Sequence, residues 1–328
     1  MYSVTEVAYQ EWTDRLQDCE HVNLVQSWQY GVAKELAEKW RAVRFLIRDD
    51  QGRAVALAQF LARELPFLGG AARMNRGPLL LGRIEPDQRE VVALAVLAAL
   101  VGECRRRRWW MIQVAPEIQH SESAVEALAS LKLRRLPTAP AASGLVSLER
   151  DDDQLLMELN GKWRNCLRKG LRSEVSVACC EGNSPELGQL LPRYRQLQEE
   201  KGFGGIPDGI ILALAAQMGA AWGFTLFVAG QGGADGVDGS IGMLVSVRHG
   251  DTSTYLIGST NETGRRLQAN YVLLWRAMQH AKNLGCRWFD IGGLNATTPQ
   301  GIAHFKQGIN AIPYTLVGEW RRLVLPIR

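Results

Sequence analysis

Hydrophobic and polar positions in the first half of the chain follow two different periods. Residues 42–50 (AVRFLIRDD) and 54–62 (AVALAQFLA) are apolar runs separated by turn residues, a pattern typical of a β-hairpin. Residues 87–108 form a long apolar stretch that predicts a helix. Residues 109–118 (WWMIQVAPEI) alternate well enough to predict a buried strand. The first half therefore predicts a hairpin, a helix and a strand, in that order.

The second half begins in the same way. Residues 223–230 (GFTLFVAG) predict a strand, and the glycine- and aspartate-rich residues 230–239 predict a turn rather than a phosphate loop. Residues 240–259 (SIGMLVSVRHGDTSTYLIGS) supply two further strands. The strands of the two halves thus follow similar patterns.

A helix and a strand then complete the second half. The helix is predicted from Asn270, a plausible N-cap, to about Leu284, with Gly285 as a stop. Its apolar face consists of Tyr271, Leu274, Trp275, Met278 and Ala281. Residues 286–294 (CRWFDIGGL) predict a strand that ends in glycines. We interpret the repeated order, at a spacing of about 175 residues, as a tandem α/β duplication.

A cationic segment joins the two halves. Residues 153–173 predict one amphipathic helix, which an aspartate among residues 151–153 can cap. Five cations share one face of it, with no acid among them: Lys162, Arg164, Arg168, Lys169 and Arg172. Two interpretations are open, an ordinary solvated face or a phosphate-binding surface for RNA or a nucleotide-linked substrate. A second cluster, Arg105–Arg108, lies at a helix C-terminus, where the helix dipole favours cations in any case.

Composition limits the class of protein. The chain has 328 residues, 46% hydrophobic and 22% charged, which fits two globular domains of about 150 residues. The formal net charge of +4 is too small to indicate a nucleic-acid binder by itself. The six cysteines and five histidines show no metal-binding spacing, so we expect no metal site. Neither a signal peptide nor a membrane span is recognisable, which predicts a cytoplasmic protein.

Candidate chemistry lies between Tyr255 and Lys306. The GxSxG nucleophile motif and the GxxxxGK[ST] phosphate loop are both absent. Residues 260–270 (TNETGRRLQAN) lead to a helix start, where free backbone N–H groups and the helix dipole favour an anion. This arrangement resembles the GNAT acyltransferase fold, in which that helix end receives phosphate groups. GNAT enzymes hold an amine and an activated carbonyl together, so proximity supplies much of the rate.

A series of motifs resembles the Fem family of aminoacyl-tRNA-dependent transferases, which add amino acids to peptidoglycan precursors. In family order they are QSWQYGVAKELAEKW, MNRGPLL, KWRNCLRKGLRSEVSV, YLIGST, NYVLLWRAMQHAKNLGCRWFDIGGL and GIAHFKQGINAIPYTLVGEW. The match covers nearly the whole chain. It implies an α/β (α+β) fold of two tandem GNAT-like domains, with mixed sheets flanked by helices and no coiled-coil arm. The domains would be residues 1–148 plus about 318–328, and residues 149–317.

The resemblance also implies site residues. Lys306 matches a lysine that faces the tRNA end and the developing oxyanion. Lys34 matches a lysine that contacts substrate phosphate, and Tyr255 lies at or next to an acceptor-contacting tyrosine. The five cations of residues 162–172 are the RNA- or phosphate-binding candidates. The further substrate-binding candidates are Arg76, Asn270 and Asp290.

Three positions depart from the family pattern. Ala115 stands where members acting on nucleotide-linked muropeptides have an aspartate before proline. Ile206 replaces an arginine before a proline, and Ile210 replaces a tyrosine. A site built for a charged acceptor would lose much of its binding from such changes. The departures therefore bear on the acceptor more than on the fold or the reaction type.

The leading hypothesis is an amide-forming aminoacyltransferase. It would move an amino acid from aminoacyl-tRNA to a primary amine, by family default on a lipid- or nucleotide-linked peptidoglycan precursor peptide. It would need no cofactor besides this co-substrate. The alternatives are an acyl-CoA-dependent GNAT N-acyltransferase in surface-polysaccharide or metabolite synthesis, and a non-catalytic RNA- or precursor-binding relative. We expect a monomer that binds no DNA and associates at most peripherally with the inner face of the membrane.

Overall fold

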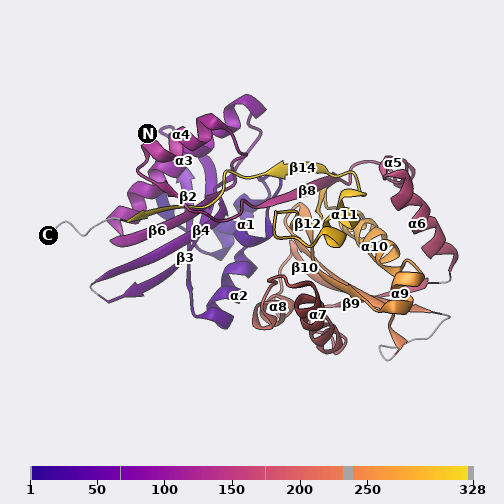
Figure 1. The fold of residues 1–328 in the computed structure, drawn as a ribbon. Coiled ribbons are helices and arrows are strands. Elements are labelled where there is room, and N and C mark those ends of the chain that lie inside the picture. The colour runs from indigo at the N-terminus through magenta and orange to yellow at the C-terminus, as the bar shows by residue number, and fades with distance from the viewer. Residues whose placement is uncertain (1, 67, 174, 232–238, 324–328) are drawn as a thin grey trace. The chain divides into compact units, whose positions relative to one another are not determined.

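The computed structural model describes residues 2–66, 68–173, 175–231 and 239–323 (Figure 1). Contacts divide the chain into two compact units. Unit 1 comprises Met1–Ala142 and Tyr314–Arg328, and unit 2 comprises Ser143–Pro313. Unit 1 is therefore assembled from both ends of the chain. The boundaries expected from the sequence, at residue 148 and about residue 317, lie a few residues beyond these.

Unit 1 is built on one mixed sheet with the strand order β1-β2-β3-β4-β6-β15-β7, and β5 also pairs with β3. Only β4 and β6 are parallel among the strand pairs that the structure describes in this sheet. The strands are β1 (Ser3–Glu6), β2 (Arg41–Arg48), β3 (Ala54–Leu65), β4 (Gly69–Gly77), β5 (Leu79–Leu80), β6 (Trp109–Pro116), β7 (Arg134–Arg135) and β15 (Trp320–Leu323). The helices are α1 (Tyr9–Leu16), the 3₁₀ turn η1 (Leu24–Gln26), α2 (Trp28–Glu38), α3 (Pro86–Arg106) and α4 (Glu122–Ser130).

Unit 2 is built on a second mixed sheet with the order β14-β8-β13-β12-β11-β10-β9, in which β12 and β13 are parallel. The strands are β8 (Ala142–Ser147), β9 (Val175–Glu181), β10 (Trp222–Gln231), β11 (Gly242–His249), β12 (Thr252–Thr260), β13 (Trp288–Asp290) and β14 (Ile312–Thr315). The helices are α5 (Asp152–Glu158), α6 (Gly161–Arg172), α7 (Leu187–Lys201), α8 (Asp208–Ala215), α9 (Glu262–Arg266), α10 (Ala269–Asn283) and α11 (Gln300–Gln307).

The two sheets share one topology, which confirms the expected duplication. In unit 1, β2, β3 and β4 form an antiparallel meander, and α3 leads to β6, which lies parallel beside β4. In unit 2, β10, β11 and β12 form the meander, and α10 leads to β13, which lies parallel beside β12. The sequence pattern missed β4, the third strand of the first meander, because its sequence GGAARMNRG has few of the β-branched residues that mark strands.

The helix between the parallel strands closes the core of each unit. Leu97 of α3 packs in one buried cluster with Trp109 of β6. Leu274 of α10 packs in another with Phe227 and Phe289. Burying a leucine or phenylalanine side chain contributes about 1.5–3 kcal/mol relative to leaving it exposed. These helices are therefore fixed on their sheets by the apolar stripes that predicted them.

The single helix expected over residues 153–173 is wrong, because the structure contains two helices there. Asp151 caps α5 as expected, accepting a hydrogen bond from the backbone N–H of Gln154 at 2.7 Å. The helix then ends before Leu159, and the Asn160 side chain caps α6. The backbone N–H of Asn160 donates to the carbonyl of Gly308 at 3.0 Å. This partner lies far along the chain, so a local pattern could not reveal the break.

Of two further expectations about where the helix α10 begins and ends, one is wrong and one is confirmed. Asn270 is not the N-cap of α10, because Gln268 holds that position in a left-handed conformation and Asn270 lies inside the helix. Gly285 follows the last turn of α10 with a φ of +79°, as a helix-stopping glycine should. Most of the turn expected at residues 230–239 lies outside the described residues.

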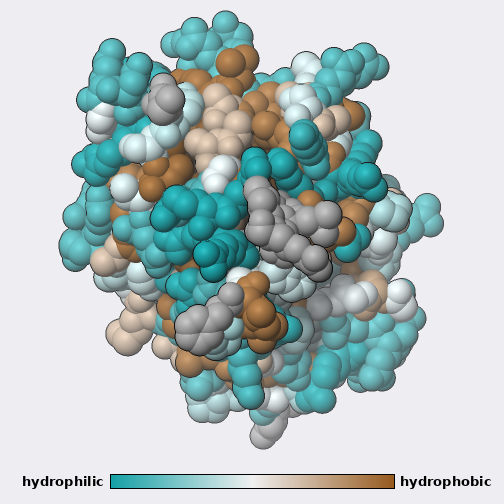
Figure 2. Space-filling view, turned by 90° about the vertical axis from the view of Figure 1, so that its left-hand side faces the viewer, coloured by the Kyte–Doolittle hydropathy of each residue, from teal (hydrophilic) through white to brown (hydrophobic). Residues whose placement is uncertain are grey.

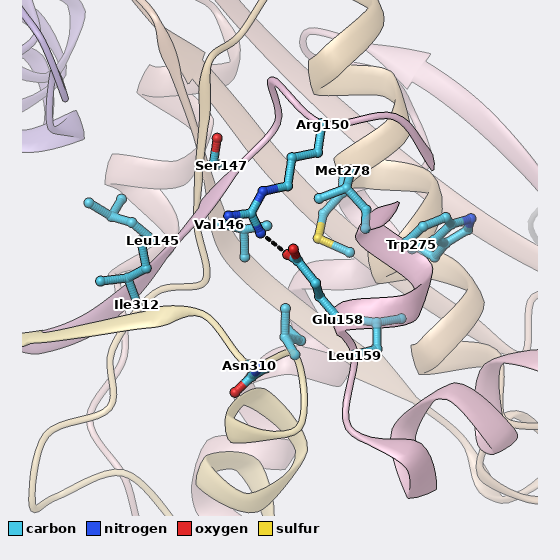
Figure 3. A pocket seen from close by; sticks show the side chains of 12 residues that line it. Leu145, Val146, Ser147, Arg150, Glu158, Leu159, Trp275, Met278, Asn310 and Ile312 are labelled. Atoms are coloured by element: carbon cyan, nitrogen blue, oxygen red, sulfur yellow. Dashed lines mark ion pairs between the residues drawn. The ribbon is translucent and has the colours of Figure 1, made fainter. Parts of the chain in front are cut away.

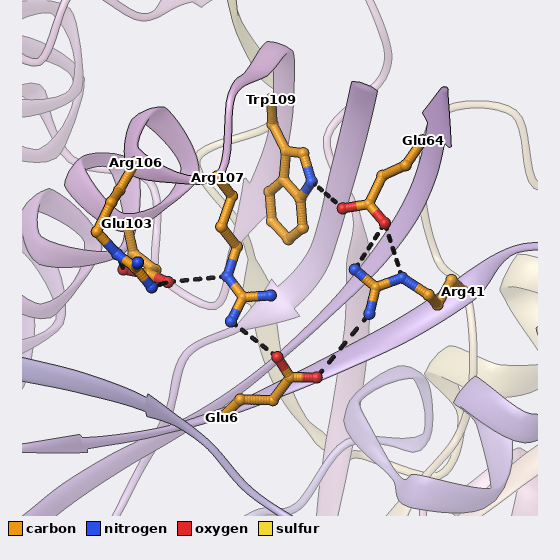
Figure 4. Close-up of polar contacts among 7 residues, drawn as sticks. All are labelled: Glu6, Arg41, Glu64, Glu103, Arg106, Arg107 and Trp109. Atoms are coloured by element: carbon orange, nitrogen blue, oxygen red, sulfur yellow. Dashed lines mark hydrogen bonds and ion pairs between the residues drawn. The ribbon is translucent and has the colours of Figure 1, made fainter. Parts of the chain in front are cut away.

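Two members of the cluster Arg105–Arg108, namely Arg106 and Arg107, form ion pairs within unit 1 (Figure 4). Glu103 accepts from Arg106 at 2.6 Å and from Arg107 at 2.8 Å. Arg107 also pairs with Glu6 at 2.8 Å. These contacts favour the structural interpretation of this cluster over a phosphate-binding one.

Figure 2 shows a mostly hydrophilic face on which hydrophobic residues occur in several separate groups. Within the described ranges, none of the helices combines the length and the apolar character that crossing a membrane requires.

Candidate active site around Lys306

Lys306 lies in the last turn of α11, which begins after Pro299. Cations are favoured at this end of a helix by its dipole, but such lysines normally extend into water. Lys306 instead turns inward and is only 6% exposed. Burying a charged group is unfavourable unless other groups compensate for the lost water. The burial of the Lys306 ammonium must therefore be explained by the groups around it.

Three groups surround the ammonium of Lys306. Its Nζ donates to the carbonyl of Gly293 at 3.4 Å and lies 4.8 Å from the centroid of the Tyr255 ring. Burial lowers the pKa of Lys306 to about 8, while the negative charge of Asp290 acts in the opposite direction. At neutral pH most of the population is therefore an ammonium with long, weak contacts. Such a group can gain considerable interaction energy when negative charge develops nearby.

Asp290 is close enough to raise the pKa of Lys306 by its charge, and it is only 3% exposed. Its Oδ1 accepts from Ser143 Oγ at 2.5 Å and from the backbone N–H of Gly292 at 2.8 Å. These bonds join β8 to the loop that follows β13. Asp290, expected to bind substrate, is thus placed to shape this loop and to act on Lys306 electrostatically.

Gly292 allows the loop to pass close to Lys306. Its φ is +71°, a left-handed conformation that side chains rarely adopt. A Cβ there would lie 2.7 Å from the backbone oxygen of Tyr255 and 3.2 Å from Lys306 Nζ. A glycine is therefore required at this point by both backbone and space.

Tyr255 lies where β12 leaves its parallel partner. The two strands are paired from Thr252 to Thr254, and β12 continues beyond that stretch. The pairing of β12 with β11 is also shifted between Tyr255 and Ile257. Burial raises the pKa of Tyr255, so its ring faces Lys306 as a neutral group. Bulges of this kind re-aim side chains and are frequent next to active sites.

A second tyrosine extends this side of the site. Tyr194 of α7 is 6% exposed and acts electrostatically on Tyr255. Burial raises the pKa of the Tyr194 hydroxyl, and the backbone of Ile206 acts on that pKa in the opposite direction. Of the departures from the family pattern, Ile206 is therefore close to Tyr194, which in turn acts on Tyr255. Ile210, by contrast, is buried within α8 at 2% exposure, and Ala115 lies at the end of β6.

The buried side of α6, opposite its cations, packs against the start of α10. Gly170 permits this approach, because a Cβ there would meet Val272 at 2.6 Å and the backbone oxygen of Gln268 at 3.1 Å. Lys162, Arg168, Lys169 and Arg172 are exposed, while Arg164 is half-buried and donates to the carbonyl of Met157 at 2.8 Å. The exposed Arg265 and Arg266 stand on α9, just before α10. We call these seven residues the cationic surface.

The connection before the helix start near Asn270 uses several of its N–H groups internally. The backbone N–H of Gly264 donates to the Asn261 side chain at 2.8 Å. The N–H groups of Leu267 and Gln268 donate to backbone carbonyls at 2.9 Å and 3.2 Å. These N–H groups are thus used within the connection, because it folds into the short helix α9, while the expected anion site at the first residues of α10 stays a prediction. Charge at this end of α10 comes mainly from arginine side chains.

Lys34 and Arg76 belong to unit 1. Lys34 forms an ion pair with Glu38 of the same helix, and this hydrogen bond lowers the pKa of Glu38. Arg76 holds Glu117 with two contacts of 2.8 Å and donates to the hydroxyl of Tyr314 at 2.8 Å. Both side chains are engaged within their own unit. The groups brought together around Lys306 are those of unit 2.

A small pocket elsewhere in unit 2 is separate from this site (Figure 3). It is lined mainly by apolar side chains of β8, α5 and α10, and the ion pair of Arg150 and Glu158 lies across it. None of the residues predicted to bind substrate or RNA lines it.

Several residues of the Lys306 site were not predicted from the sequence. Ser143 and Tyr194 carry no local signal, because a serine in a strand and a tyrosine in a helix are ordinary. The glycine pair at 292–293 was visible at the end of a predicted strand, and a strand ending in glycines is a sign of close backbone approach.

Comparisons with known proteins agree with this architecture. Residues 159–307 match the family model described as acetyltransferase (GNAT) domain. The structure is similar to FemX at 15% identity and a TM-score of 0.75, covering 98% of this chain and 97% of that one. A tandem GNAT protein from the clavulanic acid biosynthesis pathway is 14% identical, with a TM-score of 0.55 and full coverage of both chains. L-PGS from Bacillus licheniformis is 10% identical, with a TM-score of 0.51, covering 97% of this chain and 92% of that one.

A comparison with curated proteins finds no match. The identities to the solved structures are low, so the likeness establishes the fold, which is two tandem GNAT-like units. Within that fold the GNAT match spans α6, Tyr255 and Lys306. Together these findings support an acyltransferase with a tandem GNAT-like fold.

Proposed function

We propose that the chain is an aminoacyltransferase that moves an amino acid from aminoacyl-tRNA to a primary amine. The observation that carries this proposal is Lys306, a buried ammonium held between the Gly293 carbonyl and the Tyr255 ring. A positive charge preorganised in a site of low dielectric is suited to a reaction that develops an oxyanion. The resemblance to the Fem family supplies the same role for this lysine.

The proposed reaction joins the acceptor nitrogen to the ester carbonyl carbon of the donor. The carbonyl oxygen becomes an oxyanion, and collapse of the intermediate breaks the bond to the ribose oxygen. The amine nitrogen loses one proton and the ribose oxygen gains one. Lys306 would stabilise the oxyanion, and because its pKa is about 8 it can also give a proton to the leaving ribose oxygen.

The cationic surface is the basis for proposing aminoacyl-tRNA as the donor. Its side chains are spread over α6 and α9, which suits the repeated phosphates of a polynucleotide. Such contacts position a nucleic acid without reading its sequence. The surface begins at Lys162, in the first turn of α6, which also carries Trp163, the residue that contacts Phe305 just before Lys306.

The second candidate is an acyl-CoA-dependent N-acyltransferase. The GNAT family match is described as an acetyltransferase domain, which favours it. Against it stands the connection before α10, where Gly264, Leu267 and Gln268 already use their N–H groups within the turn. A compact pyrophosphate would find these three backbone amides of the connection already in use.

The acceptor proposed by family default is the amine of a peptidoglycan precursor peptide. Ile206, next to Tyr194, favours an acceptor with fewer charged contacts on that side of the site. We propose a primary amine on an otherwise weakly charged segment of the acceptor, bound beside Tyr194 and Tyr255.

The test is a transfer assay with purified protein. Mixed tRNA charged with labelled amino acids is incubated with candidate peptide and small amines, with and without excess CoA. Lys306→Met is expected to lower the transfer rate about 100-fold or more, the usual effect of losing one oxyanion donor. Lys201→Met, an exposed lysine on α7, is the control and should match the wild type. No transfer from any charged tRNA, or transfer from acyl-CoA alone, would contradict the proposal.

A further inference from the structure

α6 has a second face, opposite its cations, that holds the helix carrying Lys306. Trp163 of α6 is only 3% exposed, and its Nε1–H donates to the carbonyl of Phe305 at 3.0 Å. The rings of Trp163 and Phe305 are stacked, with centroids 6.0 Å apart. The backbone of the residue just before Lys306 is thus fixed by one side chain of α6.

The residues just after Lys306 are held by the same helix. The carbonyl of Gly308 accepts from the backbone N–H of Asn160, at the N-cap of α6. Gly308 has an ordinary helical φ of −67°, but a Cβ there would lie 2.6 Å from Cδ1 of Trp163. Lys306 is therefore placed between two backbone anchors, both on the first turn of α6.

These anchors matter because α11 has little to fix it by itself. It has eight residues, and its N-cap residue, Pro299, makes no side-chain cap. Helices this short are marginal without tertiary contacts. The contact of Lys306 Nζ with the Gly293 carbonyl is long, at 3.4 Å. The position of the ammonium is therefore set by where the last turn of α11 is held.

We propose that Trp163 is a positioning residue for Lys306, and that it ties the lysine to the helix that carries the cationic surface. The assignment rests on the proposed function for the role of Lys306. It goes beyond that function in naming the residue that sets the place and environment of the ammonium.

The pKa of Lys306 can serve as a measure of how firmly the lysine is positioned, because few other groups around it titrate in the same pH range. The titratable groups facing it are Asp290 on β13 and Tyr255 on β12, with Tyr271 on α10 and Cys166 on α6 beyond Phe305. Burial raises the pKa of Tyr255 and raises the pKa of Tyr271 to about 12, so neither hydroxyl ionises below pH 10. If α11 loosens, Lys306 gains water and its pKa should rise toward its ordinary value.

The test uses Trp163→Phe, which keeps an aromatic ring and removes the donor to Phe305. Lys306 is labelled with trace acetic anhydride at pH 6–11, and mass spectrometry gives its pKa without any need for activity. The variant is expected to raise this pKa by about one unit and to lower the transfer rate about tenfold. The alkaline limb of the pH–rate profile should move in the same direction as the labelling pKa.

A matched control is available in the same unit. Trp222 is 5% exposed and its Nε1 has no hydrogen-bond partner among the described residues, so Trp222→Phe makes the same chemical change without breaking any bond that the structure describes. It should leave the labelling pKa of Lys306 unchanged. Gly308→Ala disturbs the same contact from the other side and should shift the pKa upward, even if Trp163→Phe folds poorly.

The outcomes separate this inference from the proposed function. An unchanged Lys306 pKa in folded Trp163→Phe or in Gly308→Ala would overturn the positioning role, whatever the transfer assay gives. A shifted pKa in a protein without transfer activity would support the positioning role and count against the function alone. Equal shifts in Trp163→Phe and Trp222→Phe would indicate general loosening and would also overturn it.

Discussion

Lys306 combines burial with a charge near neutral pH, and its surroundings explain how. The ammonium has a long contact with a carbonyl, an aromatic face and a nearby carboxylate, and it forms no ion pair within 4 Å among the residues that the structure describes. Full pairing would stabilise the resting charge and leave less to gain in a transition state. At the residue scale, the site therefore keeps a positive charge that is only partly satisfied.

The first prediction concerns stability against pH. Burial lowers the pKa of Lys306 from 10.5 to about 8 in the folded protein. Between these values the unfolded chain binds the extra proton, so stability rises with pH, and below about pH 8 the penalty is fully present. The free energy of unfolding of the wild type minus that of Lys306→Met should therefore increase from about pH 8 to 10, by up to about 1.4 kcal/mol per pH unit. Urea denaturation across this range measures it, and a constant difference would contradict the buried ammonium.

A second prediction at this scale uses neighbouring glycines. Gly292→Ala places a Cβ 2.7 Å from a backbone oxygen at a φ of +71°, so we expect a loss of about 1–3 kcal/mol in the free energy of unfolding. The nearest atom to a Cβ at Gly293 is 4.0 Å away, so Gly293→Ala should cost less than about 0.5 kcal/mol. Urea denaturation of the two variants measures these changes. Equal losses in the free energy of unfolding would show that the loop is not as close to β12 as described.

At the scale of elements, α6 joins two features that the sequence presented separately. Its buried side packs against the start of α10, because Gly170 lets the helices approach, and its cations lie on the opposite face. Its apolar side reaches α11 through Trp163. The break at Asn160 makes this possible, since it gives α6 a start and a direction separate from those of α5.

The cationic surface leads to a prediction about salt. In the double variant Arg168→Gln and Lys169→Gln, the slope of log affinity for tRNA against log salt concentration should be less steep by roughly 1–2, since each lost phosphate contact removes about 0.7–0.9. The control replaces Arg83 and Lys201, which are exposed and lie outside the surface. Filter binding at 50–300 mM salt measures the slopes. Similar slopes in the two double variants would mean that α6 does not bind the RNA.

At the scale of the whole molecule, the chain ends by returning to unit 1. β15 lies between β6 and β7, with Trp320 paired with Val114. Trp320 is 3% exposed and packs in the same cluster as Trp109 and Leu97. The first core is therefore complete only when the last strand has been added, after the whole of unit 2 has been traversed.

This arrangement predicts an effect at the far end of the chain. Trp320→Ala should lower the free energy of unfolding by about 3–5 kcal/mol through loss of the buried ring. Hydrogen exchange should accelerate in β6, its partner strand. Leu323→Ala, on the same strand but 67% exposed, should change stability by less than about 0.5 kcal/mol. Unchanged exchange in β6 would contradict the pairing of β15 with that strand.

The sequence by itself determined the repeated order of strands and helices, because hydrophobic periodicity is a local property of the chain. It also marked Lys306, Tyr255 and the cations of α6 as candidates, through motifs that lie within short stretches. It did not reveal β4, the break at Asn160 or the true N-cap of α10.

Only the tertiary structure decided the surroundings of Lys306. Ser143 and Asp290 are 147 residues apart in the chain, and Trp163 and Phe305 are 142 apart. No local period encodes such pairs, because they form only when two sheets and their covering helices have closed around their cores. Whether a lysine near a glycine is solvated or buried as a charged group depends on those distant partners. Here Lys306 is buried because α6, α11 and the loop after β13 pack around it.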